Sequence, residues 1–115
     1  MNINLEQTIL RNLLTNEEYT RRVLPFLAPD YFEGVYKDLF KEVAKFVSKY
    51  NKIPTLESFK IEVDEGNRLS EEHYRQAIEM LPNIFTAESE NLDWLIERTE
   101  KWCQDRSVYL SLIHI

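Results

Sequence analysis

Residues 34–50 read GVYKDLFKEVAKFVSKY, and this stretch decides the fold class. Its apolar side chains recur every three or four residues, a spacing that places them along one face of an α-helix. They are Tyr36, Leu39, Phe40, Val43, Phe46, Val47 and Tyr50. The opposite side carries the charged residues Lys37, Lys41, Glu42, Lys45 and Lys49. The stretch therefore predicts a long helix that packs its apolar face against a core and turns its charged side to water.

The rest of the chain predicts further helices and no strand of useful length. Apolar residues at helical spacing predict helices over residues 5–14, 15–27, 55–66, 70–81 and from 91 onward. Only two glycines and four prolines are present in 115 residues, so turns are few and helices are long. We expect an all-α fold, a compact bundle of about six helices followed by a long C-terminal helix.

Polar residues before the apolar runs predict where helices begin. Thr15 and Glu18 form a Thr-x-x-Glu capping box, in which the two residues satisfy each other's backbone N–H groups. Thr55 and Ser70 each precede an apolar run and are predicted N-caps. The second helix should turn Tyr19, Val23 and either Phe26 or Leu27 inward.

Glycine and proline predict where the same helices end. Pro25 should bend or end the second helix, because proline lacks a backbone N–H and its ring clashes with the preceding turn. Gly66 should end the helix that Thr55 begins. Pro82 should stop the helix that Ser70 begins, with residues 83–90 forming a polar loop.

The last predicted helix has a start signal and no stop signal. From Asn91 to Ile115 there is no glycine or proline. One inward face is predicted for this helix, formed by Leu92, Leu95, Ile96, Thr99, Trp102, Cys103 and Tyr109. Helices commonly end near a glycine or asparagine. The sequence therefore indicates either a natural C-terminal helix or a chain cut inside a longer protein.

Composition and charge narrow the class of protein. The net charge is −6, which opposes general binding to a phosphate backbone, since that affinity comes mainly from lysine and arginine. The single cysteine, Cys103, excludes an intramolecular disulfide and fits a reducing compartment. There is no run of about 20 apolar residues and no secretion signal, so we expect a cytoplasmic protein without a membrane segment.

The motifs of common catalytic and metal sites are absent from the sequence. A P-loop needs two closely spaced glycines before Lys-Ser/Thr, and the only glycines here are Gly34 and Gly66. Zinc needs about four ligands with close pairs, but Cys103, His73 and His114 are scattered. We therefore predict no catalytic, cofactor-binding or metal-binding residue in this chain. His73 is interpreted as a first-turn surface residue and Cys103 as a small packed side chain.

Aromatic residues on the last helix are the candidates for a binding surface. Trp94 and Trp102 are suited to contact another helix or subunit, because tryptophan is enriched in interfaces. Packing on the same domain explains them equally well. With Ile96 and Tyr109 they form the predicted interface set. Residues 57–72 carry six acidic and two basic side chains, which fits either a site for a basic partner or a solvated acidic face.

Several segments taken in order resemble the N-terminal domain of DnaB-type replicative DNA helicases, in the short form found in tailed bacteriophages. The resemblance covers nearly all of residues 3–109, and it rests on the order and spacing of motifs that are each common. The motifs are Leu5-Glu6-Gln7-Thr8-Ile9-Leu10, Asp30-Tyr31-Phe32, Leu39-Phe40, Ile53-Pro54-Thr55, Leu56-Glu57-Ser58-Phe59, Trp94-Leu95-Ile96, Thr99-Glu100-Lys101 and Arg106.

The resemblance implies a noncatalytic role for this chain. In the family this domain forms the collar of a hexameric ring, pairs with other copies of the subunit, and docks primase and helicase loader. ATP and Mg²⁺ bind a separate motor domain, which also makes the contact with DNA. The resemblance thus implies no cofactor in this chain. It also implies a cytoplasmic location in an infected host cell.

The family pattern further implies domain boundaries. Residues 1–90 would form the collar domain, and residues 91–109 the first arm of an antiparallel helical hairpin whose second arm is missing. The last six residues, LSLIHI, are what the codons CTG TCT CTT ATA CAC ATC encode. That is the mosaic-end adapter of transposase-based sequencing libraries, so we expect residues 110–115 to be a non-native tail on a truncated sequence.

The sequence leaves alternative functions to weigh against the helicase collar. A free-standing α-helical adaptor or regulator would place the tryptophan-bearing helix in a partner's groove. A helix-turn-helix DNA-binding regulator is disfavoured, since its recognition helix should be basic while the helices here mix bases with acids. A complete enzyme fits the sequence least well.

Overall fold

The computed structural model describes residues 5–86 and 91–113, and these ranges are almost entirely helical. The elements are α1 (Leu5–Thr15), α2 (Glu17–Val23), the 3₁₀ turns η1 (Leu24–Phe26) and η2 (Pro29–Tyr31), α3 (Gly34–Tyr50), α4 (Leu56–Gly66), α5 (Glu71–Thr86) and α6 (Leu92–Ile113). No strand occurs within the described ranges. The predicted all-α class is confirmed.

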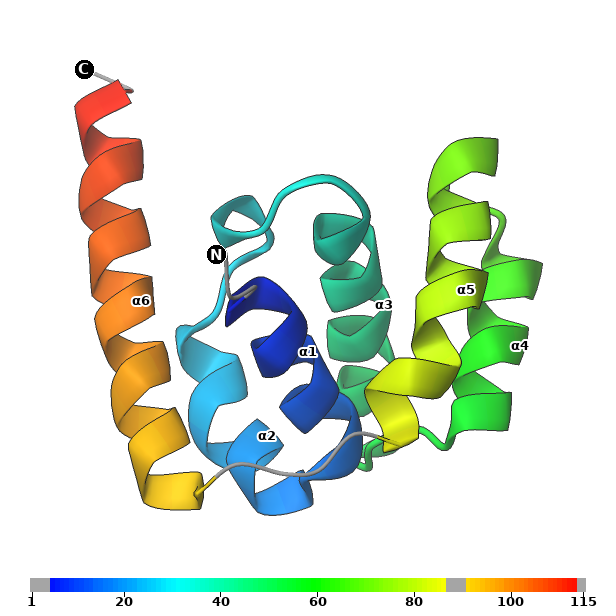
Figure 1. Cartoon of the computed structure of the whole chain (residues 1–115), viewed down its shortest axis with the longest axis horizontal. Coiled ribbons are helices and arrows are strands. Elements are labelled where there is room, and N and C mark those ends of the chain that lie inside the picture. The colour runs from blue at the N-terminus through cyan, green and yellow to red at the C-terminus, as the bar shows by residue number, and fades with distance from the viewer. Residues whose placement is uncertain (1–4, 87–90, 114–115) are drawn as a thin grey trace.

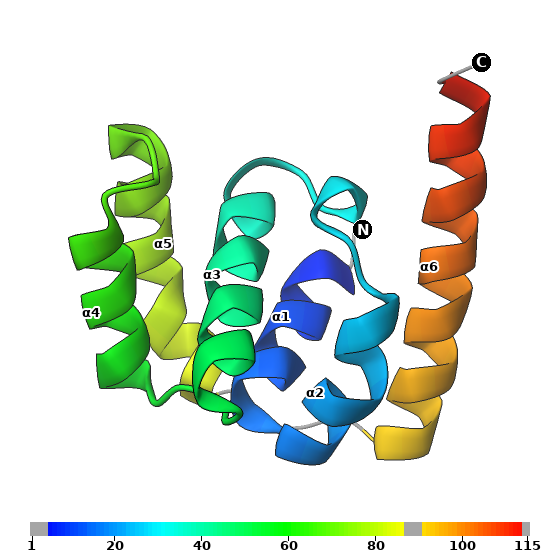
Figure 2. The same ribbon diagram turned by 180° about the vertical axis from the view of Figure 1, so that it is seen from behind.

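The helices form a central group with one flank on each side (Figure 1). In the centre, α1 packs against α2, α3 and α5. On one flank α4 and α5 lie against each other and against α3. On the other flank α6 runs beside α2 and η2, and its C-terminal end extends past them, as the view from behind also shows (Figure 2). The flank formed by α6 is therefore attached to the body mainly through one neighbouring helix and a turn.

The predicted face of α3 forms the middle of the core. Leu39, Phe40 and Val43 are buried, and the Phe40 ring stacks on Phe32 at 4.7 Å between centroids. For one residue of the predicted stripe the prediction of burial is wrong: Tyr50, in the last turn, is 48% exposed. Its ring packs on Phe46 at the surface instead, since the core no longer reaches the end of the helix.

Glu42 was predicted on the solvated side of α3, and this placement is wrong. The residue is buried, and its carboxylate accepts two hydrogen bonds from Arg68, at 2.7 Å from Nε and 3.0 Å from Nη2. A buried carboxylate requires such pairing, because loss of hydration is otherwise very costly. Gly66 leaves the space for this arginine, since a Cβ there would lie 2.8 Å from Arg68 Nη2.

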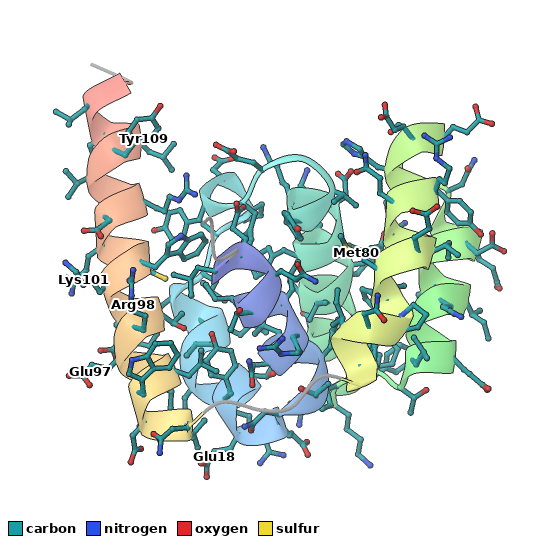
Figure 3. All side chains as sticks on the ribbon, viewed as in Figure 1. Glu18, Met80, Glu97, Arg98, Lys101 and Tyr109 are labelled. Carbon is teal, nitrogen blue, oxygen red and sulfur yellow. The ribbon has the colours of Figure 1, made fainter. Side chains whose placement is uncertain are left out.

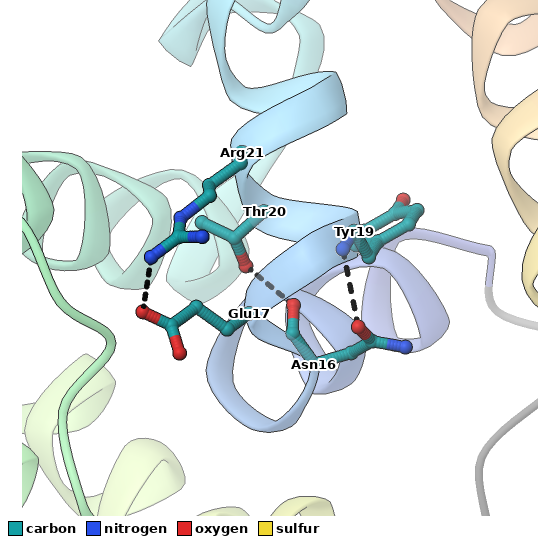
Figure 4. Close-up of polar contacts among 5 residues, drawn as sticks. All are labelled: Asn16, Glu17, Tyr19, Thr20 and Arg21. Carbon is teal, nitrogen blue, oxygen red and sulfur yellow. Dashed lines mark hydrogen bonds and ion pairs between the residues drawn. The ribbon is translucent and has the colours of Figure 1, made fainter.

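The start of α2 also differs from the prediction. Asn16 is the N-cap, and its side-chain oxygen accepts a hydrogen bond from the Tyr19 N–H at 3.1 Å (Figure 4). Thr15 is still the last residue of α1, where its hydroxyl donates to the Arg11 carbonyl. The capping box of Thr15 and Glu18 is therefore absent, because asparagine one position later takes the capping role.

Of the other predicted boundaries, most are close to those observed. Thr55 caps α4 with a reciprocal hydrogen bond to Ser58, and Ser70 accepts from the His73 N–H, as predicted for these caps. Pro25 lies in η1, directly after α2 ends. In that turn Leu27, rather than Phe26, packs against the core. At the end of α4 the left-handed residue is Asn67, one position after Gly66.

Pro82 does not stop α5, which continues to Thr86. Leu81 and Ile84, on either side of the proline, are both buried. Packing of these side chains against the core offsets the loss of one backbone hydrogen bond at the proline. The predicted loop therefore does not include residues 83–86, and residues 87–90 lie outside the described part of the chain.

Candidate interaction surface

Asn91 precedes the first residue of α6, and its side-chain oxygen accepts a hydrogen bond from the Trp94 N–H at 3.0 Å. From this start one face of the helix turns toward α2 and η2. The side chains buried on this inner face are Leu95, Ile96, Thr99, Trp102 and Cys103. They fall at helical spacing, so the inner face continues the core of the molecule.

A buried hydrogen bond joins α6 to α2. The Tyr19 hydroxyl and the Thr99 hydroxyl lie 2.7 Å apart, and both residues are fully buried. Loss of hydration raises the pKa of Tyr19, and the hydrogen bond to Thr99 partly opposes this rise. Because a buried polar group without a partner is costly, each hydroxyl fixes the position of the other. The hydrogen bond between Tyr19 and Thr99 therefore fixes the position of α6 along α2.

The ring of Trp102 anchors the middle of α6. It packs edge-on against Tyr31 at 6.0 Å between ring centroids, and in a tilted arrangement against Phe32 at 5.1 Å. The Arg106 guanidinium lies over the same ring at 5.3 Å. Aromatic and cation–π contacts of this kind add to the free energy gained from burial alone. Trp102 therefore belongs to the core of this chain.

Charged residues lie at the edge of the contact between α6 and the body of the molecule. The Glu6 carboxylate accepts a hydrogen bond from the Glu33 N–H at 2.8 Å. Arg106 lies between two carboxylates, 3.9 Å from Glu6 and 3.8 Å from Glu33. Burial raises the pKa of Glu6, while the Glu33 N–H and the Arg106 charge act in the opposite direction. This cluster ties α6 to the start of α1 and to the turn before α3.

The opposite side of α6 exposes large apolar side chains to solvent. Trp94 is 50% exposed, Val108 60% and Leu112 64%. A heptad-like stripe, which we call the outer stripe, follows steps of four and three residues along this side. It consists of Trp94, Arg98, Lys101, Asp105, Val108 and Leu112. The spacing is that of a heptad repeat, with apolar residues at both ends of the stripe and the charged residues Arg98, Lys101 and Asp105 in its middle.

Figure 3 shows Glu97 and Lys101 on the side of α6 that faces away from the body of the molecule. A shallow hollow of about 270 Å³ lies there, lined by Trp94, Glu97, Arg98 and Lys101. Trp94 thus stands beside two basic side chains. Exposed aromatic residues next to arginine are typical of protein–protein contacts.

A second hollow, which we call the Cys103 groove, lies between α6 and the two 3₁₀ turns. Its volume is about 440 Å³. It is lined by Phe26, Tyr31, Glu100, Cys103, Gln104 and Ser107. Burial raises the pKa of the Cys103 thiol to about 11, and the Glu100 carboxylate adds to the rise. At neutral pH the thiol is therefore protonated, and it contributes an apolar wall to the groove.

Two of the four residues of the predicted interface are exposed and two are buried. Trp94 lies on the outer side of α6, while Ile96 and Trp102 are buried against the body of the same chain. Tyr109 follows Trp102 by two turns on the inner side (Figure 3), but its predicted burial on the inward face is wrong, because α6 extends past the body there and leaves the ring 55% exposed. The interface role of the set stays a prediction. Sequence reasoning did not select Val108 or Leu112, although their heptad spacing from Trp94 was a usable signal.

The predicted surface residue His73 makes a specific contact. Its Nδ1 lies 2.5 Å from the Asp38 carboxylate, so it links the first turn of α5 to α3. Tyr74, the next residue, donates a hydrogen bond to Asp64 of α4 at 2.8 Å. Both contacts join helices on the flank away from α6, and they account for part of the polar surface of α5.

Neither a metal centre nor a membrane span is found in the part of the chain that the structure describes. Within residues 5–86 and 91–113 no three histidine, cysteine or acidic side chains are grouped so as to hold a metal ion. No helix in those ranges is long and apolar enough to cross a bilayer. What the described surface offers is apolar and charged contact area along α6.

Comparison with known proteins gives one informative match. Over 104 residues, or 90% of its length, the chain is 27% identical to a protein of Enterobacteria phage T4 described as a DnaB-like replicative helicase. The chain spans 22% of the length of that relative. No protein-family model matches the chain. The match agrees with the predicted resemblance to the N-terminal domain of phage helicases of this type.

Proposed function

We propose that this chain serves as the N-terminal collar and interaction region of a phage replicative DNA helicase. In this role it joins subunits of the helicase and offers a docking surface for primase or helicase loader. The similarity to the phage T4 protein over nine tenths of the chain carries the proposal. The all-helical fold and the exposed apolar side of α6 support it, because both suit a noncatalytic assembly module.

The outer stripe is the proposed subunit contact. Between residues 94 and 109 it presents Trp94 and Val108, with three charged residues between them, while Leu112 lies in the expected non-native tail and is not counted in the contact. Apolar side chains at heptad spacing lose contact with water when a second helix packs along them. In the assembled helicase this second helix would belong to a neighbouring subunit.

ATP and Mg²⁺ have no proposed site among these residues. The sequence contains neither the closely spaced glycines nor the lysine that a phosphate-binding loop requires. Nucleotide binding, strand separation and contact with DNA are assigned to a motor domain outside this chain. We place the whole protein in the cytoplasm of an infected host cell.

The source DNA provides the direct test. Once the adapter-like codons of residues 110–115 are trimmed, overlapping sequence should continue the reading frame from Tyr109 into a second helix and then a P-loop. Other codons for these six residues would contradict the adapter interpretation. A stop codon within a few residues would contradict the helicase collar and favour a free-standing adaptor, whose exposed tryptophan would bind a partner's groove.

A biochemical test follows once the complete reading frame is known. The full protein should hydrolyse ATP, and this chain alone should not. Deleting residues 1–109 from the full protein should weaken its assembly into rings, as measured by light scattering. Rings that form equally well without these residues would contradict the assembly role.

A further inference from the structure

The Cys103 groove has the character of a receptor for one large side chain. Tyr31, Cys103 and the exposed ring of Phe26 give it apolar walls, and Phe26 keeps 63% of its surface in solvent. Glu100 is the only charged residue in the lining. Among the described residues the Glu100 side chain makes no ion pair. A mostly apolar hollow with one charge selects an apolar group that has a basic neighbour.

The outer stripe carries a group of that kind. Trp94 is half exposed and lies in the same hollow as Arg98 and Lys101. Lys101 is 4.0 Å from Asp105, while Arg98 has no ion-pair partner within the described part of the chain. A tryptophan ring of this kind buries about 150–250 Å² when it enters a pocket, which the groove has the volume to accept.

We infer that Trp94 of one copy of this chain docks in the Cys103 groove of a second copy, with Arg98 or Lys101 facing Glu100. The inference rests on the proposed function. It adds the site on the second copy that binds Trp94, the first residue of the outer stripe. It uses the charge of both surfaces. The groove is lined by one acid and no base, and the hollow around Trp94 is lined by two bases, Arg98 and Lys101, and one acid, Glu97.

A single copy cannot make this contact within itself. Trp94 and Cys103 are nine residues apart on one straight helix, which separates them by about 13 Å along its axis. The contact therefore requires a second molecule. One ring and one ion pair bury far less than the roughly 1,200 Å² of a stable interface, so we expect weak association of the isolated chain.

Disulfide trapping tests the docking without removing the residues that make it. Glu97→Cys places a thiol beside Trp94, and native Cys103 supplies the second thiol in the groove. Residues 97 and 103 of one helix are about 9 Å apart along the axis, too far for a disulfide within one chain. Oxidation at about pH 9, where more of the Cys103 thiol ionises, should give chains linked through residues 97 and 103.

Matched variants make the result specific. Adding Phe26→Ala or Trp94→Ala to Glu97→Cys should lower the yield of the 97–103 disulfide at least about fivefold, as an apolar anchor is lost. Both residues are exposed, and circular dichroism checks that each variant keeps its helices. Glu65→Cys, on the exposed side of α4, is the control for random collision.

Charge reversal checks the polar half of the contact. Glu100→Lys should lower the 97–103 yield, and combining it with Arg98→Glu and Lys101→Glu should restore it. A yield equal to the Glu65→Cys control, disulfides between two copies of residue 97 alone, or no recovery in the combined variant would overturn the inference. The proposed function would survive that result, because the reading frame and ring assembly test it separately.

Discussion

Helices α3 and α6 are both long, and α3 buries more of its apolar side chains within the chain than α6 does. The apolar face of α3 is buried by α1, α4 and α5, and its other side is mainly charged. Helix α6 buries its inner face against α2 and η2 but also exposes Trp94, Val108, Tyr109 and Leu112. The difference shows that α3 completes the core, whereas α6 buries one face and leaves large apolar side chains on the surface, where we propose a second contact.

The two tryptophans of α6 test this comparison most directly, and Trp102→Ala should give the largest change in the free energy of unfolding. Trp102→Ala should lower the free energy of unfolding by about 3–5 kcal/mol, because it removes a buried ring that contacts Tyr31 and Phe32. Trp94→Ala should change it by less than about 0.5 kcal/mol. Urea titration of both variants checks this. Similar losses for the two would show that α6 does not have one inner and one outer face.

The core of α3 is tested by Leu39→Ala. Leu39 is fully buried, so the change should cost about 2–5 kcal/mol through lost burial and a residual cavity. Tyr50→Ala in the exposed last turn is the control and should cost under about 1 kcal/mol. Thermal unfolding followed by circular dichroism measures both. A cost below about 0.5 kcal/mol for Leu39→Ala would mean that the apolar face of α3 is misassigned.

The attachment of α6 to α2 is tested by Tyr19→Phe. This change removes the hydroxyl that pairs with Thr99 and leaves the Thr99 hydroxyl buried without its partner. We expect a loss of about 1–2 kcal/mol in the free energy of unfolding. Tyr109→Phe, in the exposed C-terminal part of α6, should be neutral. Adding Thr99→Val to Tyr19→Phe should recover part of the loss, and no recovery would argue against the hydrogen bond.

The smallest effect is expected at the charged edge of α6. Because burial raises the pKa of Glu6 above its ordinary value of 4.5, the folded chain holds this proton more tightly than the unfolded chain. The contribution of Glu6 to stability therefore increases as pH falls from neutral toward 4.5. Glu6→Gln should remove that increase while staying within about 1 kcal/mol of the unmodified chain at pH 7. Parallel pH profiles for the two chains would contradict this assignment.

The sequence was sufficient for features that depend on local spacing. The periodicity of residues 34–50 predicted the buried positions Leu39, Phe40 and Val43. Thr55 and Ser70 were identified as caps, since each is the one capping residue directly before its helix. For the candidate surface, the aromatic residues of α6 were selected, but their spacing did not separate Trp94 from Trp102.

Features that depend on distant partners could not be predicted. Glu42 was placed in solvent because its partner, Arg68, is 26 residues away in the sequence. Pro82 was taken as a stop, since the burial of Leu81 and Ile84 that maintains α5 is a tertiary effect. The Cys103 groove requires Phe26 and Tyr31 to meet α6, and no local pattern contains that contact.

One measurement tests most directly that the outer side of α6 is a contact surface. The chain has two tryptophans, so 5-fluorotryptophan labelling gives two ¹⁹F NMR signals, assigned with Trp94→Phe. As protein concentration rises toward about 1 mM, where weak contacts become populated, the Trp94 signal should shift. A Trp94 signal that stays constant over the whole range would contradict the account.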